Sequence, residues 1–334
     1  MAYRWSNVCV VGGAGFIGSN LCEALVAQGA RVRIVDNFST GKTENISPIA
    51  QRPEVEVVKA DITDPDACPA AVKGVEVVFD LAALGVRHSI PRPVRNFEVN
   101  GNGTLNLLLA ARDAGVKRFI YTSSSEAYGT AMWVPMDENH PNQPMTVYGA
   151  GKLAGEALTR AFHRTYGMPT MVVRPFNAYG PNVPHEGDCG VVISKFIVRV
   201  MNGLPPIIFG DATNARDFTY VADTVRGILG AAACDAMVGE TVNIAYGQPR
   251  TVDEVARIVL KTCGREDLKP IIERPRPGDV HMHYADTRKA EKLFGWKAKV
   301  SLDEGIPMLI DHLKRKGADW TKMLTEDKTF NWEE

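Results

Sequence analysis

A tyrosine and a lysine four positions apart could carry out acid–base chemistry. Tyr148 and Lys152 fall within the stretch 146–166, whose pattern predicts a long helix, so both side chains should share one helix face. An ammonium beside a phenol favours the phenolate and lowers the pKa of the phenol. Tyr148 is therefore a candidate general base near neutral pH, although such a pair can also be an ordinary surface feature of a helix.

A run of serines lies upstream of this pair, at the end of a predicted strand, 119–123. Ser123, Ser124 and Ser125 would then lie at the carboxyl edge of a parallel sheet, where ligands bind. A serine hydroxyl there can hydrogen-bond a substrate oxygen and steer its proton to the tyrosine. Glu126 follows the run, and its carboxylate is either a base toward the substrate or a structural group that bonds backbone amides where the strand ends. We predict the structural role.

A glycine-rich turn follows the first predicted strand, 8–11. Gly12, Gly15 and Gly18 form a GxxGxxG pattern, one residue wider in its first gap than the GxGxxG dinucleotide fingerprint. A side chain at either of the first two positions would keep the backbone away from a pyrophosphate. The third glycine allows close helix–strand packing, and the N-terminus of the helix faces the anion. The pattern predicts a dinucleotide site.

Acidic residues after the next two predicted strands support this site. Asp36 ends the second strand, about where an acid binds the adenosine ribose hydroxyls. Its charge would repel a 2′-phosphate, so NAD is favoured over NADP. Asp61 and Ile62, after the third strand, are expected to face the adenine.

These residues need a scaffold of alternating strands and helices. We predict strands at 8–11, 31–35, 55–60, 75–81, 119–123 and 170–174, with helices at 19–28, 100–114 and 146–166 among them. Helices of this length between strands imply parallel pairing through right-handed crossovers. Strands that are apolar throughout fit a sheet covered on both faces. The fold class is therefore α/β, a Rossmann-like doubly wound parallel sheet.

The chain changes character after Pro175, and we expect a smaller, discontinuous C-terminal α/β domain there. Stretches 218–221 and 241–244 are predicted strands that could return to the sheet. We assign 1–176 and 217–247 to NAD binding, and 177–216 and 248–317 to the substrate. Residues 318–334 have few apolar anchors and are predicted to form a loosely attached tail.

Composition narrows the function classes. The 334 residues carry a formal net charge of -1, which argues against a nucleic-acid partner. No apolar run approaches the roughly 18 residues needed to span a bilayer, and Met1 to Asn7 lacks a signal-peptide pattern. The six cysteines are scattered without CxxC and are expected to be reduced in a cytoplasmic protein. His281 and His283 have no neighbours that complete a ligand set, so we expect no metal site.

Taken together, Gly12–Gly18, Asp36, the serine run ending in Tyr128-Gly129, the Tyr148–Lys152 pair and Arg174–Asn177 resemble the extended short-chain dehydrogenase/reductase family. The chain is more narrowly similar to its NAD-dependent nucleotide-sugar epimerases and dehydratases, over about residues 7 to 312.

The resemblance implies roles for individual residues. It makes Ser124 and Tyr148 catalytic, Lys152 the holder of the nicotinamide ribose, and Asn100 a structural asparagine near the cofactor. The full set of expected cofactor contacts is Gly12, Gly15, Phe16, Ile17, Gly18, Asp36, Asp61, Ile62, Ala82, Asn100, Tyr148 and Lys152. The expected substrate contacts are Ser124, Ser125, Asn177, Arg216, Arg276 and Asp279. Two guanidinium groups, those of Arg216 and Arg276, would match diphosphate oxygens, and Asp279 would lie by the nucleotide ribose.

The resemblance also implies a homodimer, in which the helix around 100–114 and the Tyr148 helix pair with their copies in a four-helix bundle. The apolar positions Leu107, Leu108, Leu158 and Phe162 allow such a bundle. Burial of the same side chains under the chain's own domain is the alternative.

The implied chemistry is a transient oxidation at C4 of the sugar, which forms a 4-keto sugar. Reduction of this ketone from the opposite face gives a 4-epimer, loss of water across C5–C6 gives a 4-keto-6-deoxy sugar, and loss of carbon dioxide from a uronic acid gives a pentose. Segment 84–89 and the Tyr148 helix resemble 4-epimerases, so we predict a UDP-hexose 4-epimerase. Glu126 after Ser125 keeps a 4,6-dehydratase open as the alternative. Asn182 stands where uronate-specific relatives often place an arginine, which argues against a UDP-glucuronate epimerase or decarboxylase. A non-catalytic NAD-binding protein of this fold is the remaining alternative.

Overall fold

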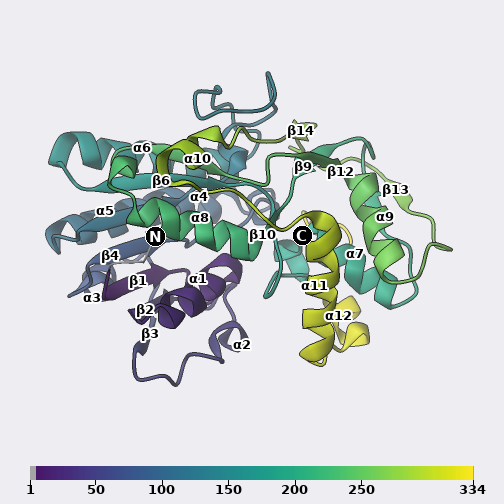
Figure 1. The fold of residues 1–334 in the computed structure, drawn as a ribbon, viewed down its shortest axis with the longest axis horizontal. Helices are drawn as coiled ribbons and strands as arrows, with labels where there is room; N and C mark the ends of the chain where they lie inside the picture. The colour runs from purple at the N-terminus through teal and green to yellow at the C-terminus, as the bar shows by residue number, and fades with distance from the viewer. Residues whose placement is uncertain (1–4, 334) are drawn as a thin grey trace.

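The computed structural model describes residues 5–333, so the predictions for Met1 to Arg4 and for Glu334 lie outside it. Its centre is a seven-stranded sheet of order β11-β6-β5-β4-β1-β2-β3, parallel throughout (Figure 1). The strands are β1 (Asn7–Val11), β2 (Arg31–Asp36), β3 (Val55–Lys59), β4 (Val77–Asp80), β5 (Arg118–Thr122), β6 (Thr170–Pro175) and β11 (Thr241–Ile244). The predicted doubly wound α/β fold is confirmed.

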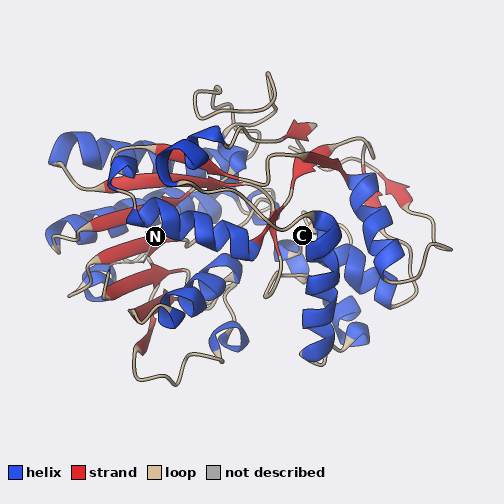
Figure 2. Ribbon diagram, viewed as in Figure 1, coloured by secondary structure: helices blue, strands red, loops and turns tan. Residues whose placement is uncertain are grey.

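Helices cover both faces of this sheet (Figure 2), because successive side chains of a buried strand point to opposite sides. In β1, Val8 and Val10 join the core beneath α1 (Phe16–Ala27), α8 (Val221–Ala233) and α10 (Arg288–Phe294). Cys9 and Val11 join the core beneath α3 (Cys68–Val72), α5 (Thr104–Asp113) and α6 (Val147–Tyr166). Within residues 5–333 no helix has both the length and the apolar character required to cross a membrane.

Three of the positions named for a dimer interface belong to this second core. Leu107 and Leu108 on α5 are fully buried, and Phe162 on α6 is nearly so. They pack inside the chain's own domain, which is the alternative to a dimer interface given above for these side chains. Their burial leaves them unavailable to a second copy of the chain.

A third core holds the C-terminal part together. The helices α7 (Val192–Met201), α9 (Val252–Thr262) and α11 (Leu302–Arg315) contribute most of it. Short strands flank these helices, in the pairings β12-β9-β14, β13-β8 and β10-β7. Their bounds are β7 (Ala178–Tyr179), β8 (Ile207–Phe209), β9 (Ala215–Asp217), β10 (Thr219–Tyr220), β12 (Pro249–Thr251), β13 (Ile271–Glu273) and β14 (Met282–His283). The remaining α-helices are α2 (Thr43–Ile46), α4 (Pro93–Phe97) and α12 (Trp320–Glu326).

Two predictions about this half need correction. The predicted strand 218–221 does not return to the central sheet: β10 pairs with β7 instead. The other predicted strand, 241–244, does return to the sheet, as β11 beside β6. The tail also differs from the loosely attached segment expected, because α12 packs against α7 and Trp332 is buried.

Candidate active site

The glycine-rich turn brings the first strand and its helix into close contact. Gly12 has a φ of +76°, and a Cβ at this position would lie 2.7 Å from the backbone nitrogen of Ala82. A Cβ at Gly18 would lie 2.1 Å from the carbonyl oxygen of Gly12. α1 begins at Phe16 behind the N-cap Gly15, which supplies no side-chain cap to its first amides. Those N–H groups are therefore free to bind a pyrophosphate.

A cavity of about 510 Å³ opens beside this turn, at the carboxyl ends of the first strands. Six of the predicted cofactor residues line it together: Gly12, Gly15, Asp36, Asp61, Ile62 and Ala82. Leu84 and Val99 add apolar walls. Phe16, Ile17 and Gly18 lie in the first turn of α1 and are not part of this lining. A mostly apolar cleft with a few polar groups fits a dinucleotide at this edge of the sheet.

Asp36 is committed to the backbone around this cavity. Its carboxylate accepts hydrogen bonds from the amides of Ala14 at 2.9 Å and Phe38 at 2.8 Å. Burial raises the pKa of Asp36, and the two amide bonds oppose that rise. Asp36 thus ties the glycine-rich turn to the loop after β2, and its binding of a ribose remains a prediction.

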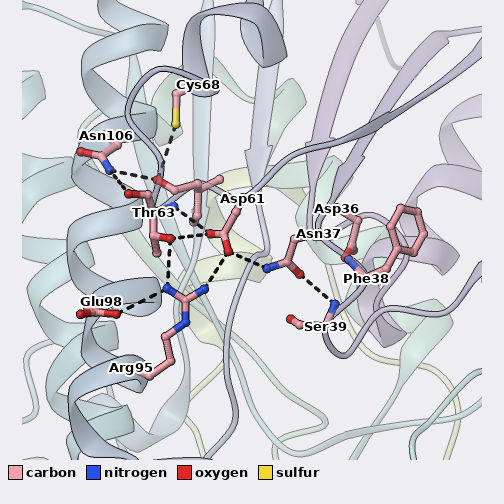
Figure 3. Close-up of polar contacts among 11 residues, drawn as sticks. Asp36, Asn37, Phe38, Ser39, Asp61, Thr63, Cys68, Arg95, Glu98 and Asn106 are labelled. Carbon is pink, nitrogen blue, oxygen red and sulfur yellow. Dashed lines mark hydrogen bonds and ion pairs between the residues drawn. The ribbon is translucent and has the colours of Figure 1, made fainter.

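Asp61 lies in a polar cluster at the rim of the cavity (Figure 3). Its carboxylate accepts hydrogen bonds from Asn37 at 2.9 Å, from the Thr63 hydroxyl at 2.7 Å and from Arg95 at 2.7 Å. Burial alone would raise the pKa of Asp61, but these donors lower it to about 2. The residue is therefore a fixed anion. Asn37 and Arg95 were not anticipated from the sequence, because neither belongs to a motif.

Asn100 is buried behind the same cavity. Its amide donates to the carbonyl of Leu84 at 3.0 Å and to the side-chain oxygen of Asn96 at 2.9 Å. Because Leu84 lines the cavity, these bonds hold one wall in place. The arrangement is consistent with the structural role expected for this asparagine.

The catalytic candidates meet where β5 ends and α6 begins. Thr146 caps α6 by accepting from the amide of Gly149 at 3.2 Å, which places Tyr148 in the first helical turn. Ser124 caps the short helix 125–127, and its hydroxyl accepts from the amide of Glu126 at 3.2 Å. Burial raises the pKa of Tyr148 to about 12, a hydrogen bond with Ser124 opposes the rise, and the charge of Glu126 adds to it. Ser124 and Tyr148 therefore lie together, and their catalytic roles remain a prediction.

Lys152 is bonded to the end of β5. Its ammonium donates to the carbonyl of Thr122 at 2.9 Å and lies 4.9 Å from the ring centre of Tyr121. Burial lowers the pKa of Lys152 to about 8, against the opposing charges of Asp80 and Glu156. The pKa of Tyr148 is raised overall and the Lys152 ammonium is bonded to Thr122, so a depression of the Tyr148 pKa by this ammonium remains a prediction.

The predicted diphosphate clamp is assembled from residues distant in the sequence. Arg216 on β9 donates to a carboxylate oxygen of Asp279 at 2.9 Å, and Nε of Arg276 lies 3.6 Å from the other oxygen. Burial lowers the pKa of Arg276 to about 9, and the charge of Arg87 lowers it further. Arg87 also interacts electrostatically with Asp279 and Arg216. Two guanidinium groups therefore contact one carboxylate, and the charge of Arg87 acts on the same group, an excess of positive charge that suits a diphosphate.

Arg87 is a site residue that the sequence analysis did not predict, although it lies in the segment 84–89 that resembles 4-epimerases.

Ser125 and the side-chain oxygen of Asn177 are buried, and that oxygen has no hydrogen-bond partner within residues 5–333. The substrate contacts of Ser125 and Asn177 remain predictions. No group of three or more His, Cys, Asp or Glu residues in the described part of the chain could hold a metal ion.

Glu126 differs from its predicted structural role. Its carboxylate makes no hydrogen bond to the backbone amides among the residues described, because the strand end is capped by the Ser124 hydroxyl instead. A Cβ at Gly149 would lie 2.5 Å from the carbonyl oxygen of Glu126, so Glu126 lies beside the start of α6 that carries Tyr148. A role of its carboxylate toward the substrate remains a prediction.

Comparison with known proteins identifies the family. Residues 9–309 match the family model described as GDP-mannose 4,6 dehydratase. The chain therefore belongs to this family, within the extended short-chain dehydrogenase/reductases that comprise NAD-dependent nucleotide-sugar epimerases and dehydratases. The predictions of an enzyme of this class and of NAD as its cofactor are confirmed.

Individual relatives carry several activities. A UDP-glucose 4-epimerase of Mycolicibacterium smegmatis is 34% identical, with 92% of this chain and 98% of that protein covered. UDP-glucuronic acid decarboxylase 2 of Arabidopsis thaliana is 34% identical, with 93% of this chain and 68% of that protein covered. The structure of a dTDP-glucose 4,6-dehydratase from Streptomyces venezuelae with NAD bound superimposes with a TM-score of 0.89. It is 29% identical, with 95% of this chain and 99% of that chain covered.

Proposed function

We propose that the protein is an NAD-dependent nucleotide-sugar 4-epimerase that acts on a UDP-hexose. One observation carries the proposal: the segment that holds Arg276 and Asp279 packs against the start of the Tyr148 helix, since a Cβ at Gly278 would lie 2.7 Å from the side chain of Thr146, the N-cap of α6. A sugar would lie at Ser124 and Tyr148, and its diphosphate at the arginines. The UDP-glucose 4-epimerase relative supports the choice of substrate.

The residues of this chain divide the work. Bound NAD supplies a reversible hydride acceptor at C4 of the sugar. Tyr148 takes the proton of the 4-hydroxyl, and Ser124 holds that oxygen in line with the phenol. The arginine cluster keeps the diphosphate in place while the 4-keto sugar turns and presents its other face. When hydride returns to the opposite face of C4, Tyr148 gives the proton back to the C4 oxygen, which restores the hydroxyl with inverted configuration.

A 4,6-dehydratase is the second candidate, and Glu126 is the observation that favours it. After oxidation at C4 the ketone acidifies the C5 proton, and a carboxylate nearby would drive loss of water across C5–C6. Decarboxylation of a uronate has less support. Asn182, where an arginine would receive the uronate carboxylate, donates to Ser19 at 3.0 Å and accepts from Lys316 at 3.1 Å.

The test incubates the purified protein with UDP-, dTDP-, GDP- and CDP-sugars and reads the products by mass and NMR. The expected product is a 4-epimer of unchanged mass, formed without net consumption of NAD. Glu126→Gln should lower the rate only modestly, and Glu126→Asp serves as the charge-conserving control. A product that has lost water, together with loss of that reaction in Glu126→Gln but not in Glu126→Asp, would establish the dehydratase instead.

We also propose a homodimer, formed through exposed side chains of α4 and α5 and not through the buried Leu107, Leu108 and Phe162. Val94 and Phe97 on α4 and Leu109 on α5 are exposed, and these helices lie beside α6. Exposed apolar side chains on neighbouring helices favour association with a second copy. Light scattering at micromolar concentration should give twice the chain mass, and a monomer would refute the proposal.

A further inference from the structure

The C-terminal segment 327–333 covers a second cavity of about 380 Å³ beside α7. Most of its lining comes from the body of the protein, and the segment adds one side: Val192, Phe196, Phe209, Arg276 and, from the segment, Asp327 and Thr329. In Figure 1, α12 lies against α7, and the segment follows it to the C-terminus. The family match ends at residue 309, so this side is built by chain outside the matched region.

The cavity adjoins the diphosphate clamp, because Arg276 belongs to both. Its Nε is buried and makes no hydrogen bond within the described residues. In a nucleotide sugar the diphosphate joins the sugar on one side to the nucleoside on the other. With the sugar at Tyr148, the nucleoside must extend beyond the clamp. The cavity combines an aromatic wall at Phe209 with charged groups at Lys195, Arg199 and Arg276, and an aromatic face beside hydrogen-bonding groups suits a nucleobase next to a phosphate.

Several contacts fix the segment in place. Asp327, whose side chain is only 3% exposed, pairs with Lys195 at 2.8 Å. The ring of Trp332 packs edge-on against Phe209 at 5.0 Å between centroids. The amide of Asn331 donates to the carbonyl oxygens of Gly187 at 3.1 Å and Gly190 at 3.3 Å. These contacts hold the segment over the cavity from both ends.

We propose that segment 327–333 is the closing wall of the nucleoside-binding half of the substrate site. The proposal rests on the proposed function as a nucleotide-sugar enzyme. Through Trp332 the segment contacts Phe209 and lies 6.0 Å from the Arg276 guanidinium, and through Asp327 it pairs with Lys195. A nucleoside diphosphate therefore binds against the segment, and the segment acts as a positioning element without touching the reacting carbon.

The test compares three variants with the wild type by calorimetric titration of UDP and, separately, of NAD. The first ends at Glu326, the second is Trp332→Ala, and the third is the control Lys322→Ala, on the exposed face of α12. The first two should raise the Kd for UDP roughly tenfold or more, as loss of a buried aromatic anchor does at binding sites. The control should match the wild type, and unchanged NAD binding in all three shows that the fold is intact.

Unchanged or tighter UDP binding by the shortened chain would overturn the proposal, since the segment would then be a mere covering or an obstruction. Hydrogen exchange gives an independent measurement: amides of 327–333 should be slowed by UDP and not by NAD. If the wild type converts a sugar nucleotide but both tail variants bind UDP as tightly as the wild type does, this inference is refuted and the proposed function is not. Weaker UDP binding in the variants, with no sugar nucleotide converted by the wild type, refutes only the proposed reaction. Absence of binding of UDP, dTDP, GDP and CDP to the wild type refutes both.

Discussion

Replacing Glu156 with glutamine should destabilise the scaffold that carries the catalytic pair. Glu156 lies one turn beyond Lys152 on α6 and is fully buried. Its carboxylate accepts from Arg174 on β6 at 2.7 and 2.6 Å, from Ser123 at 2.5 Å and from Arg160 at 2.9 Å. Burial would raise the pKa of Glu156, yet the bonds and charge of Arg174 leave it lowered, so the group is an anion. It joins α6 to the ends of β5 and β6.

The size of the effect follows from what remains after the substitution. Arg174 is 2% exposed, so Glu156→Gln leaves a buried guanidinium without its counter-ion. Breaking a buried pair from one side costs about 3–5 kcal/mol. Removing both charges, as in Glu156→Gln with Arg174→Met, should cost less than Glu156→Gln alone, because no uncompensated charge is left. The exposed pair Arg257–Asp253 on α9 gives a matched control: Asp253→Asn should cost only about 0–1 kcal/mol.

Urea denaturation at pH 7, monitored by fluorescence and by circular dichroism, measures these differences as free energies of unfolding. The buried cluster should separate clearly from the surface pair, and turnover of Glu156→Gln should fall because Tyr148 and Lys152 are no longer held against β5. A loss for Glu156→Gln no larger than that for Asp253→Asn would refute the reasoning. It would mean that the charge of Glu156 is not needed to compensate the buried Arg174.

Three further predictions concern the site itself. Tyr148→Phe should lower turnover by roughly 10²-fold or more while NAD still binds, since only the proton acceptor is removed; retention of most activity would exclude Tyr148 as the base. Asp36→Ala should weaken the binding of NAD and bring the Kd for NAD closer to the Kd for NADP. An unchanged ratio of the two Kd values would contradict the role of Asp36 at the ribose. The third is a pH profile of kcat/KM. The pKa of Tyr148 is raised to about 12, so activity should rise with pH as more phenolate forms. The pKa of Lys152 is lowered to about 8, so the rise should stop above that pH as the ammonium is lost, and a continued rise would exclude a need for the charge on Lys152.

The sequence by itself determined the parallel sheet and the cofactor turn. Strand and helix periods are local, and a glycine pattern such as Gly12–Gly18 acts within one turn, so both can be predicted without knowledge of distant contacts. The same holds for Tyr148 and Ser124, because one lies at a helix start and the other at a strand end. Each position follows from the element that carries it.

Only the tertiary structure decided which distant groups meet. Arg216 and Arg276 lie on separate segments, and their convergence on Asp279 depends on how the C-terminal half of the chain packs. The direction of the Lys152 ammonium was set by the Thr122 carbonyl, and Leu107 was buried by the packing of α5 on the sheet. The docking of segment 327–333 likewise rests on long-range contacts. Helical spacing and strand alternation say which residues share a face, but the partner of that face is fixed by the packing of elements far apart in the chain.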